Sequence, residues 1–96
     1  MADDNNENEN ERQADECLAR GIKKIEAGDH EGAIADFNKA IELKPDYAEA
    51  YVSRGGTNSE LGKHEQTLVD CDKAIELKPD YTEAYILRGT AKGDLG

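Results

Sequence analysis

The chain has 96 residues, enough for one small domain, and carries 22 acidic against 12 basic residues, a formal net charge of −10. This balance disfavours nucleic acid as a partner, because an acidic surface repels phosphate. No apolar stretch is long enough to span a membrane, and the acidic N-terminus fits neither a secretory signal nor a mitochondrial presequence. The expected location is cytoplasmic, with no membrane contact.

Residues 1–13 read MADDNNENENERQ and are almost entirely polar or acidic. A segment with so few apolar side chains has nothing to bury, so we expect a disordered acidic tail. Its simplest role is to keep the chain in solution. Capture of a basic partner is the alternative.

From residue 14 onward the sequence repeats itself every 34 residues. The octapeptide AIELKPDY stands at residues 40–47 and returns unchanged at residues 74–81. We therefore divide residues 14–96 into one complete repeat over 14–47, a second over 48–81 and the beginning of a third over 82–96. A period of this size indicates a solenoid of stacked supersecondary units.

Each repeat predicts a pair of helices. Ala33, Phe37 and Ala40 fall at spacings of three and four residues, which places them on one apolar helical face. Pro45 and Pro79 end the second helices, since proline lacks an N–H group. The aspartates after these prolines, each followed by Glu three residues later, predict capping boxes for the next helices. The expected helices span about 15–27, 31–43, 47–61, 65–77 and 81–94.

These residues resemble the tetratricopeptide repeat, a 34-residue helix–turn–helix unit. The matching positions are the helix-contact glycines, small or aromatic residues of the second helices, and the terminal prolines: Gly21, Gly55, Gly89, Ala33, Phe37, Ala40, Ala74, Pro45 and Pro79. The resemblance implies an all-α fold, an α-solenoid of about five antiparallel helices. Departures from the family pattern occur at Cys17, Lys24, Asn58, Thr67, Cys71 and Lys92.

The sequence contains few residues that suggest chemistry. We interpret Cys17 and Cys71 as small buried hydrophobes, because both fall on apolar helical faces. His30 and His64 lie one repeat apart, too far to share one zinc ion. Asp70 and its i+2 neighbour Asp72 face different directions on a helix. We therefore expect no active site, no metal site and no cofactor.

The resemblance further implies a concave groove lined by the first helix of each repeat. Its residues are the second, fifth and ninth of each repeat: Asp15, Leu18, Ile22, Glu49, Val52, Gly56, Glu83, Ile86 and Thr90. The second positions form an acidic row and the fifth positions an apolar row. Such a groove would bind a protein or peptide with basic and apolar character. Alternatively, these are ordinary half-exposed residues without a ligand.

Family members that dock chaperones hold a C-terminal carboxylate with Lys, Asn and Arg side chains. The corresponding positions here hold Leu18, Ile22, Ser53, Glu83 and Leu87. Since none of the five matches and Glu83 would repel a carboxylate, we predict that this clamp is absent. Arg20, Arg54 and Arg88 recur one per repeat, either as a structural stripe that bonds neighbouring helices or as a ladder for anions.

The expected fifth helix has no obviously polar face, yet its partner helix is missing. Either the chain is a piece of a longer repeat array, or the open apolar face pairs with another copy, which would give a homodimer through that helix. The sequence as a whole predicts a non-catalytic protein–protein interaction module, a scaffold or adaptor. Two alternatives stay open. One is a self-associating structural repeat fragment, and the other is an accessory interaction domain of a larger enzyme.

Overall fold

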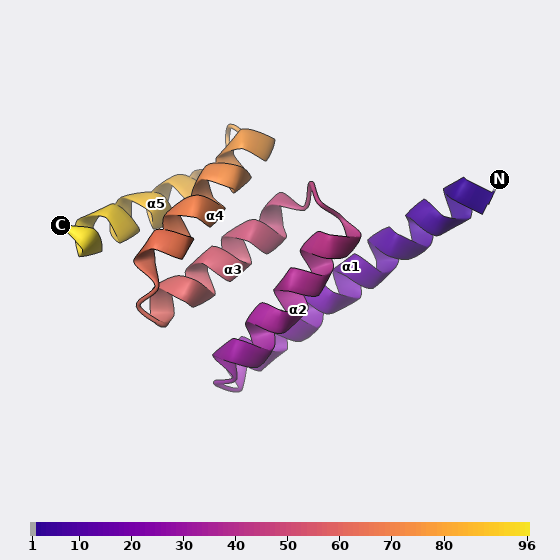
Figure 1. Cartoon of the computed structure of the whole chain (residues 1–96), viewed down its shortest axis with the longest axis horizontal. Helices are drawn as coiled ribbons and strands as arrows, with labels where there is room; N and C mark the ends of the chain where they lie inside the picture. The colour runs from indigo at the N-terminus through magenta and orange to yellow at the C-terminus, as the bar shows by residue number, and fades with distance from the viewer. Residues whose placement is uncertain (1) are drawn as a thin grey trace. The chain divides into compact units, whose positions relative to one another are not determined.

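From Ala14 onward the helices form where apolar residues recur at helical spacing. The computed structural model describes the backbone of residues 2–96 and the side chains from residue 7 onward. Over that range the regular structure consists of α1 (Ala2–Glu26), α2 (His30–Leu43), α3 (Ala48–Glu60), α4 (His64–Leu77) and α5 (Thr82–Leu95) (Figure 1). The predicted all-α class is confirmed. Apart from the start of α1, every helix end lies within one residue of its prediction.

Glycine separates the two helices within each complete repeat. Gly28 and Gly62 have φ values of +86° and +79°, a left-handed backbone conformation that strongly favours glycine. The two turns also share their hydrogen bonds. The N–H of Asp29 donates to the carbonyl of Lys24 at 2.7 Å, and that of Lys63 donates to Asn58 at 2.8 Å. The chain reverses here, and α2 packs on α1 as α4 packs on α3.

Proline separates one repeat from the next, as predicted, but the predicted capping boxes do not form. The N-cap residues of α3 and α5 are Tyr47 and Tyr81, and neither has a side-chain cap hydrogen bond. Asp80 instead lies inside a turn that the N–H of Tyr81 closes by donating to the carbonyl of Lys78 at 3.0 Å. The turn after the proline delays the helix start beyond the aspartate, so its carboxylate is not at the N-cap.

The structure differs from the predicted disordered stretch at residues 1–13, because α1 begins at Ala2. Local side-chain pairs support this extension. Arg12 pairs with Glu9 one turn before it and with Glu16 one turn after it, the latter at 3.3 Å. Gln13 donates to Glu9 at 3.0 Å. Pairs at these spacings stabilise a helix without any tertiary contact, which the count of apolar side chains does not capture.

The chain divides into two compact units, Met1–Asp46 and Tyr47–Gly96. The first unit is the antiparallel pair of α1 and α2 (Figure 1). Its central contact joins Gly21 of α1 and Phe37 of α2. A Cβ atom placed on Gly21 would lie only 2.5 Å from Cε1 of the Phe37 ring, which is fully buried. Glycine is therefore needed here because the aromatic ring occupies the space where a side chain would lie.

The second unit contains α3, α4 and α5, and α4 contacts both of the others. Its apolar cluster contains Ala74, Tyr81 and Ala84, with Val52 and Ile75 packed against it. Thr67, at the position of Ala33 in the first unit, is fully buried. Its hydroxyl donates to the carbonyl of Gly55 at 2.9 Å. This hydrogen bond satisfies the polar group that replaces the small apolar residue.

Candidate binding surface

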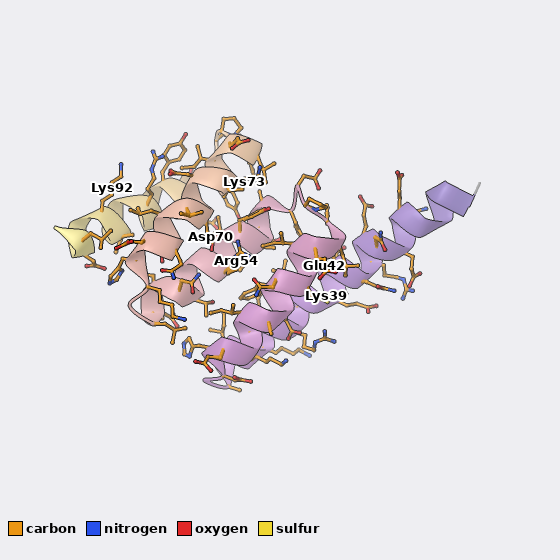
Figure 2. The ribbon with its side chains drawn as sticks, in the orientation of Figure 1. Lys39, Glu42, Arg54, Asp70, Lys73 and Lys92 are labelled. Atoms are coloured by element: carbon orange, nitrogen blue, oxygen red, sulfur yellow. The ribbon has the colours of Figure 1, made fainter. Side chains whose placement is uncertain are left out.

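An arginine of each first helix pairs with an aspartate of α2 or α4. In the second unit Arg54 makes a two-pronged contact with Asp70: Nε lies 3.0 Å from Oδ2, and Nη2 lies 2.7 Å from Oδ1. Figure 2 shows the two side chains facing each other between α3 and α4. These hydrogen bonds raise the pKa of Arg54, although burial alone would lower it. The interpretation as a structural stripe is confirmed for this arginine.

The first unit builds a related site around Asp36. Its Oδ1 accepts from Nε of Arg20 at 3.0 Å, and Nζ of Lys24 lies 2.9 Å from Oδ2. Burial raises the pKa of Asp36, but the hydrogen bonds from Lys24 and Arg20 outweigh that effect and leave the pKa lowered. Lys24 therefore replaces the aromatic residue of the family pattern with a second cation for the same carboxylate.

The third arginine turns back toward the preceding helix. Nη1 of Arg88 on α5 donates to Oδ1 of Asp72 on α4 at 3.0 Å, and Asp72 is largely exposed. Asp70 is bonded to α3 and Asp72 to α5. The two carboxylates therefore face different directions, as predicted from their i, i+2 spacing. The pairs hold α4 to α3 on one side and to α5 on the other.

The predicted groove residues of the first unit lie on α1. Asp15 is exposed, Ile22 is 39 % exposed, and Leu18 is buried with 5 % exposed. Leu18 therefore contributes mainly to packing in the structure, although its repeat position predicted a groove contact. The period-34 pattern identifies the helical face but not how deeply each side chain is buried.

The predicted groove residues of the second unit lie on α3 and α5, two helices that contact each other. Glu49 and Glu83 are both exposed. Of the apolar row, Val52 is half-buried and Ile86 is 64 % exposed. At the ninth positions, Gly56 is half-buried and Thr90 is exposed. The surface of α3 and α5 therefore presents two carboxylates beside apolar side chains.

Both cysteines are buried, and His64 lies near an acidic side chain. Cys17 and Cys71 are both buried and free. Burial raises the pKa of Cys71 to about 11, with Asp70 and Asp72 adding to the rise, so this thiol stays protonated at neutral pH. Nδ1 of His64 lies 3.6 Å from Oδ2 of Asp94. In the described part of the chain, no group of three or more His, Cys, Asp and Glu side chains could hold a metal ion.

Sequence reasoning missed Asp36 and Lys24 as polar partners across a helix pair. A signal for the first was present. Arg20 and Asp36 return one period later as Arg54 and Asp70, so an acid and a base recur together at a spacing of sixteen residues. The pairing of Lys24 with an acid does not recur one period later, because Asn58 takes the place of the lysine in the second repeat.

Comparison with known proteins points to one family. Residues 23–62 match the family model described as TPR repeat, and residues 48–81 match the one described as Tetratricopeptide repeat. No curated protein sequence matches the chain. No helix in the described part of the chain is long and apolar enough to cross a membrane.

Among the solved structures that share this fold, three match the chain over most of its length. The second TPR of Spaghetti (RPAP3), bound to the HSP90 peptide SRMEEVD, is 31 % identical with a TM-score of 0.88, over 92 % of this chain and 82 % of that one. The Arabidopsis OM64 TPR domain is 27 % identical with a TM-score of 0.88, over 90 % and 71 %. The TPR2B domain of yeast Sti1 in its pHsp70 complex is 27 % identical with a TM-score of 0.85, over 88 % and 67 %.

Proposed function

The chain belongs to the tetratricopeptide repeat family, and from this premise we propose that it is a non-catalytic protein–protein interaction module. Similar domains of Spaghetti and Sti1 were solved with an HSP90 peptide and with pHsp70. Their likeness to this chain supports peptide binding as the general mode.

The surface of α3 and α5 supports a ligand with basic and apolar residues. The observation that carries this proposal is the exposure of Glu49 and Glu83 at equivalent positions of two contacting helices, beside Val52 and Ile86. Carboxylates on the rim attract cationic side chains and repel anionic ones. Apolar side chains one helical turn from each carboxylate supply the buried area that a peptide needs for affinity.

The same surface argues against an acidic ligand such as SRMEEVD. The positions that would hold a terminal carboxylate carry Ser53, Glu83 and Leu87 in the second unit, and none of them is a cation. Leu87 is half-buried and its Cδ2 atom approaches Gly55, so it has a packing role instead. Arg54 is held by Asp70. We therefore propose that this module is not a chaperone carboxylate clamp.

A peptide array with graded charge tests the proposal. We expect basic amphipathic peptides to bind and SRMEEVD not to bind. The double variant Glu49→Lys plus Glu83→Lys should bind basic peptides more weakly, with a Kd raised at least about tenfold, because a few favourable charge contacts are lost. The matched control, Glu65→Lys plus Glu76→Lys on α4, makes the same charge change at exposed positions and should bind as the wild type. Binding that survives the reversal at 49 and 83 would contradict the proposal.

A further inference from the structure

Tyr81 is a buried aromatic residue whose polar end has no partner within the described part of the chain. It is 9 % exposed, and its ring forms an apolar cluster with Ala74 and Ala84, against which Ala48 and Val52 of α3 pack. Among the described residues, no donor or acceptor is bonded to its hydroxyl group. Buried tyrosine hydroxyl groups usually find a hydrogen-bond partner, so this one is available to a group from outside the chain.

Two carboxylates lie near this hydroxyl group, one from each of two helices that contact each other. Burial raises the pKa of Tyr81, and the charges of Glu83 on α5 and Glu49 on α3 raise it further. The hydroxyl group therefore stays neutral at physiological pH, and its oxygen can accept a hydrogen bond. Both glutamates are exposed, so a cation from solvent can reach them. The tyrosine thus adds an oxygen acceptor to the acidic surface of α3 and α5.

Lys78 determines which kind of cation suits this place. Its Nζ lies over the Tyr81 ring, 4.6 Å from the centroid, in a cation–π contact. An aromatic face that is already covered by one cation offers little to a quaternary ammonium, which has no N–H donor and is recognised through such faces. A primary ammonium has three N–H donors and is suited to oxygen acceptors instead. The chemistry of the site therefore favours a lysine side chain with its N–H groups free.

We propose that Glu49, Glu83 and the hydroxyl group of Tyr81 bind the side-chain ammonium of an unmethylated lysine from the peptide partner. The ammonium donates to an oxygen of each residue. The hydrocarbon part of the lysine lies along Val52 and Ile86, which stand one helical turn after the two glutamates. This inference rests on the proposed function and makes it more specific, because N–H donors, and not positive charge alone, select the partner.

Peptides that differ only in methylation separate this proposal from general attraction between charges. The basic peptides of the array are acetylated at the N-terminus, so that lysine supplies the only primary ammonium. Each lysine is replaced singly by trimethyl-lysine, which keeps the positive charge and removes the N–H donors. Fluorescence anisotropy measures binding to the full-length chain. At the lysine that occupies the site, trimethylation should raise the Kd at least about fivefold, the scale of a hydrogen bond to a charged group.

Variants of the chain test the role of the tyrosine. Tyr81→Phe removes the hydroxyl group and keeps the ring in its apolar cluster. It should reduce the preference for lysine over trimethyl-lysine at least about twofold, since one of the oxygen acceptors is lost. The matched control is Tyr85→Phe, which removes a hydroxyl group that already donates to the carbonyl of Pro79 at 2.9 Å. This control should keep the full preference for lysine.

The outcomes separate this inference from the proposed function. If basic peptides bind, and the reversal of Glu49 and Glu83 abolishes their binding, the proposed function is supported. Within that result, trimethylation that is tolerated at every lysine overturns the lysine site, and so does a Tyr81→Phe variant that keeps the full preference. If no basic peptide binds up to millimolar concentration, both the proposed function and this inference are wrong.

Discussion

Gly21 and Gly89 occupy the same repeat position but lie in opposite surroundings. The first lies against the buried ring of Phe37, whereas a Cβ atom added to the second would have no neighbouring atom within 4 Å. Sequence periodicity gives the two glycines one role, as helix-contact residues. The structure assigns that role to the first alone, because a contact residue needs a neighbouring helix to contact.

Substitution by alanine should therefore have opposite effects at the two sites. Gly21→Ala forces the ring of Phe37 to move and should destabilise the chain by about 1–3 kcal/mol. Gly89→Ala removes backbone freedom from the unfolded chain without a clash and should stabilise by about 0.5–1 kcal/mol. Urea unfolding followed by circular dichroism measures both. Equal destabilisation by the two substitutions would be inconsistent with the open surroundings of Gly89.

Asp36 links stability to pH. Its pKa is lowered in the folded chain, so the folded state binds a proton less readily than the unfolded state does. The stabilisation is fully present above the unfolded pKa of about 4 and is lost as the pH falls through the lower, folded pKa. We expect Asp36→Asn to be less stable than the wild type at pH 7 and to approach it at the acid end. A difference in unfolding free energy that is constant from pH 7 to pH 2 would contradict this assignment.

At the scale of elements, the helix ends were largely predictable and the start of α1 was not. Gly28, Gly62 and the two prolines act through the local backbone, so their positions alone end the helices. The extension of α1 depends on pairs among exposed residues such as Glu9, Arg12 and Glu16. These pairs contribute no buried area, which was the criterion that predicted a tail.

The N-terminal turns of α1 should be dispensable for the rest of the chain. Residues 7–13 are all exposed, and among the side chains of α1 that the structure describes, the first buried one is that of Ala14. Removal of residues 1–13 should lower the helical circular dichroism signal in proportion to the turns removed. The midpoint temperature of thermal unfolding should stay unchanged. Removal of residues 1–20, which also deletes Cys17 and Leu18, should abolish the cooperative transition of the first unit. A midpoint that falls by several degrees in the shorter truncation would show that those turns carry tertiary contacts.

The site residues were predicted less completely than the fold. Glu49, Glu83 and Ile86 lie exposed on first helices, as their repeat positions indicated. The burial of Leu18 and the use of Lys24 as a second partner for Asp36 were not foreseen. Repeat position determines the direction in which a side chain points. How deeply that side chain is buried, and which residue it bonds to, depend on what packs over it, and the packing differs between repeats.

At the scale of the whole molecule, the net charge of −10 should shape which peptides associate and how salt affects them. Surface charges are screened over about 10 Å at 0.1 M salt and about 3 Å at 1 M. We expect the affinity for a basic peptide to fall several-fold when salt rises across that range. In the Glu49→Lys plus Glu83→Lys variant the affinity should vary much less with salt. A basic peptide whose Kd is independent of salt would bind through apolar contacts alone.

The octapeptide at residues 40–47 and 74–81 has the same local geometry in both places. Lys44 has φ −140° and ψ 86°, and Lys78 has φ −141° and ψ 88°. Because both boundaries of the second repeat carry identical sequence and backbone, an extra copy of residues 48–81 could be spliced in after residue 81 without creating any new junction. Duplication or loss of one repeat is therefore a conservative change for this chain, and its length can be engineered in steps of 34 residues.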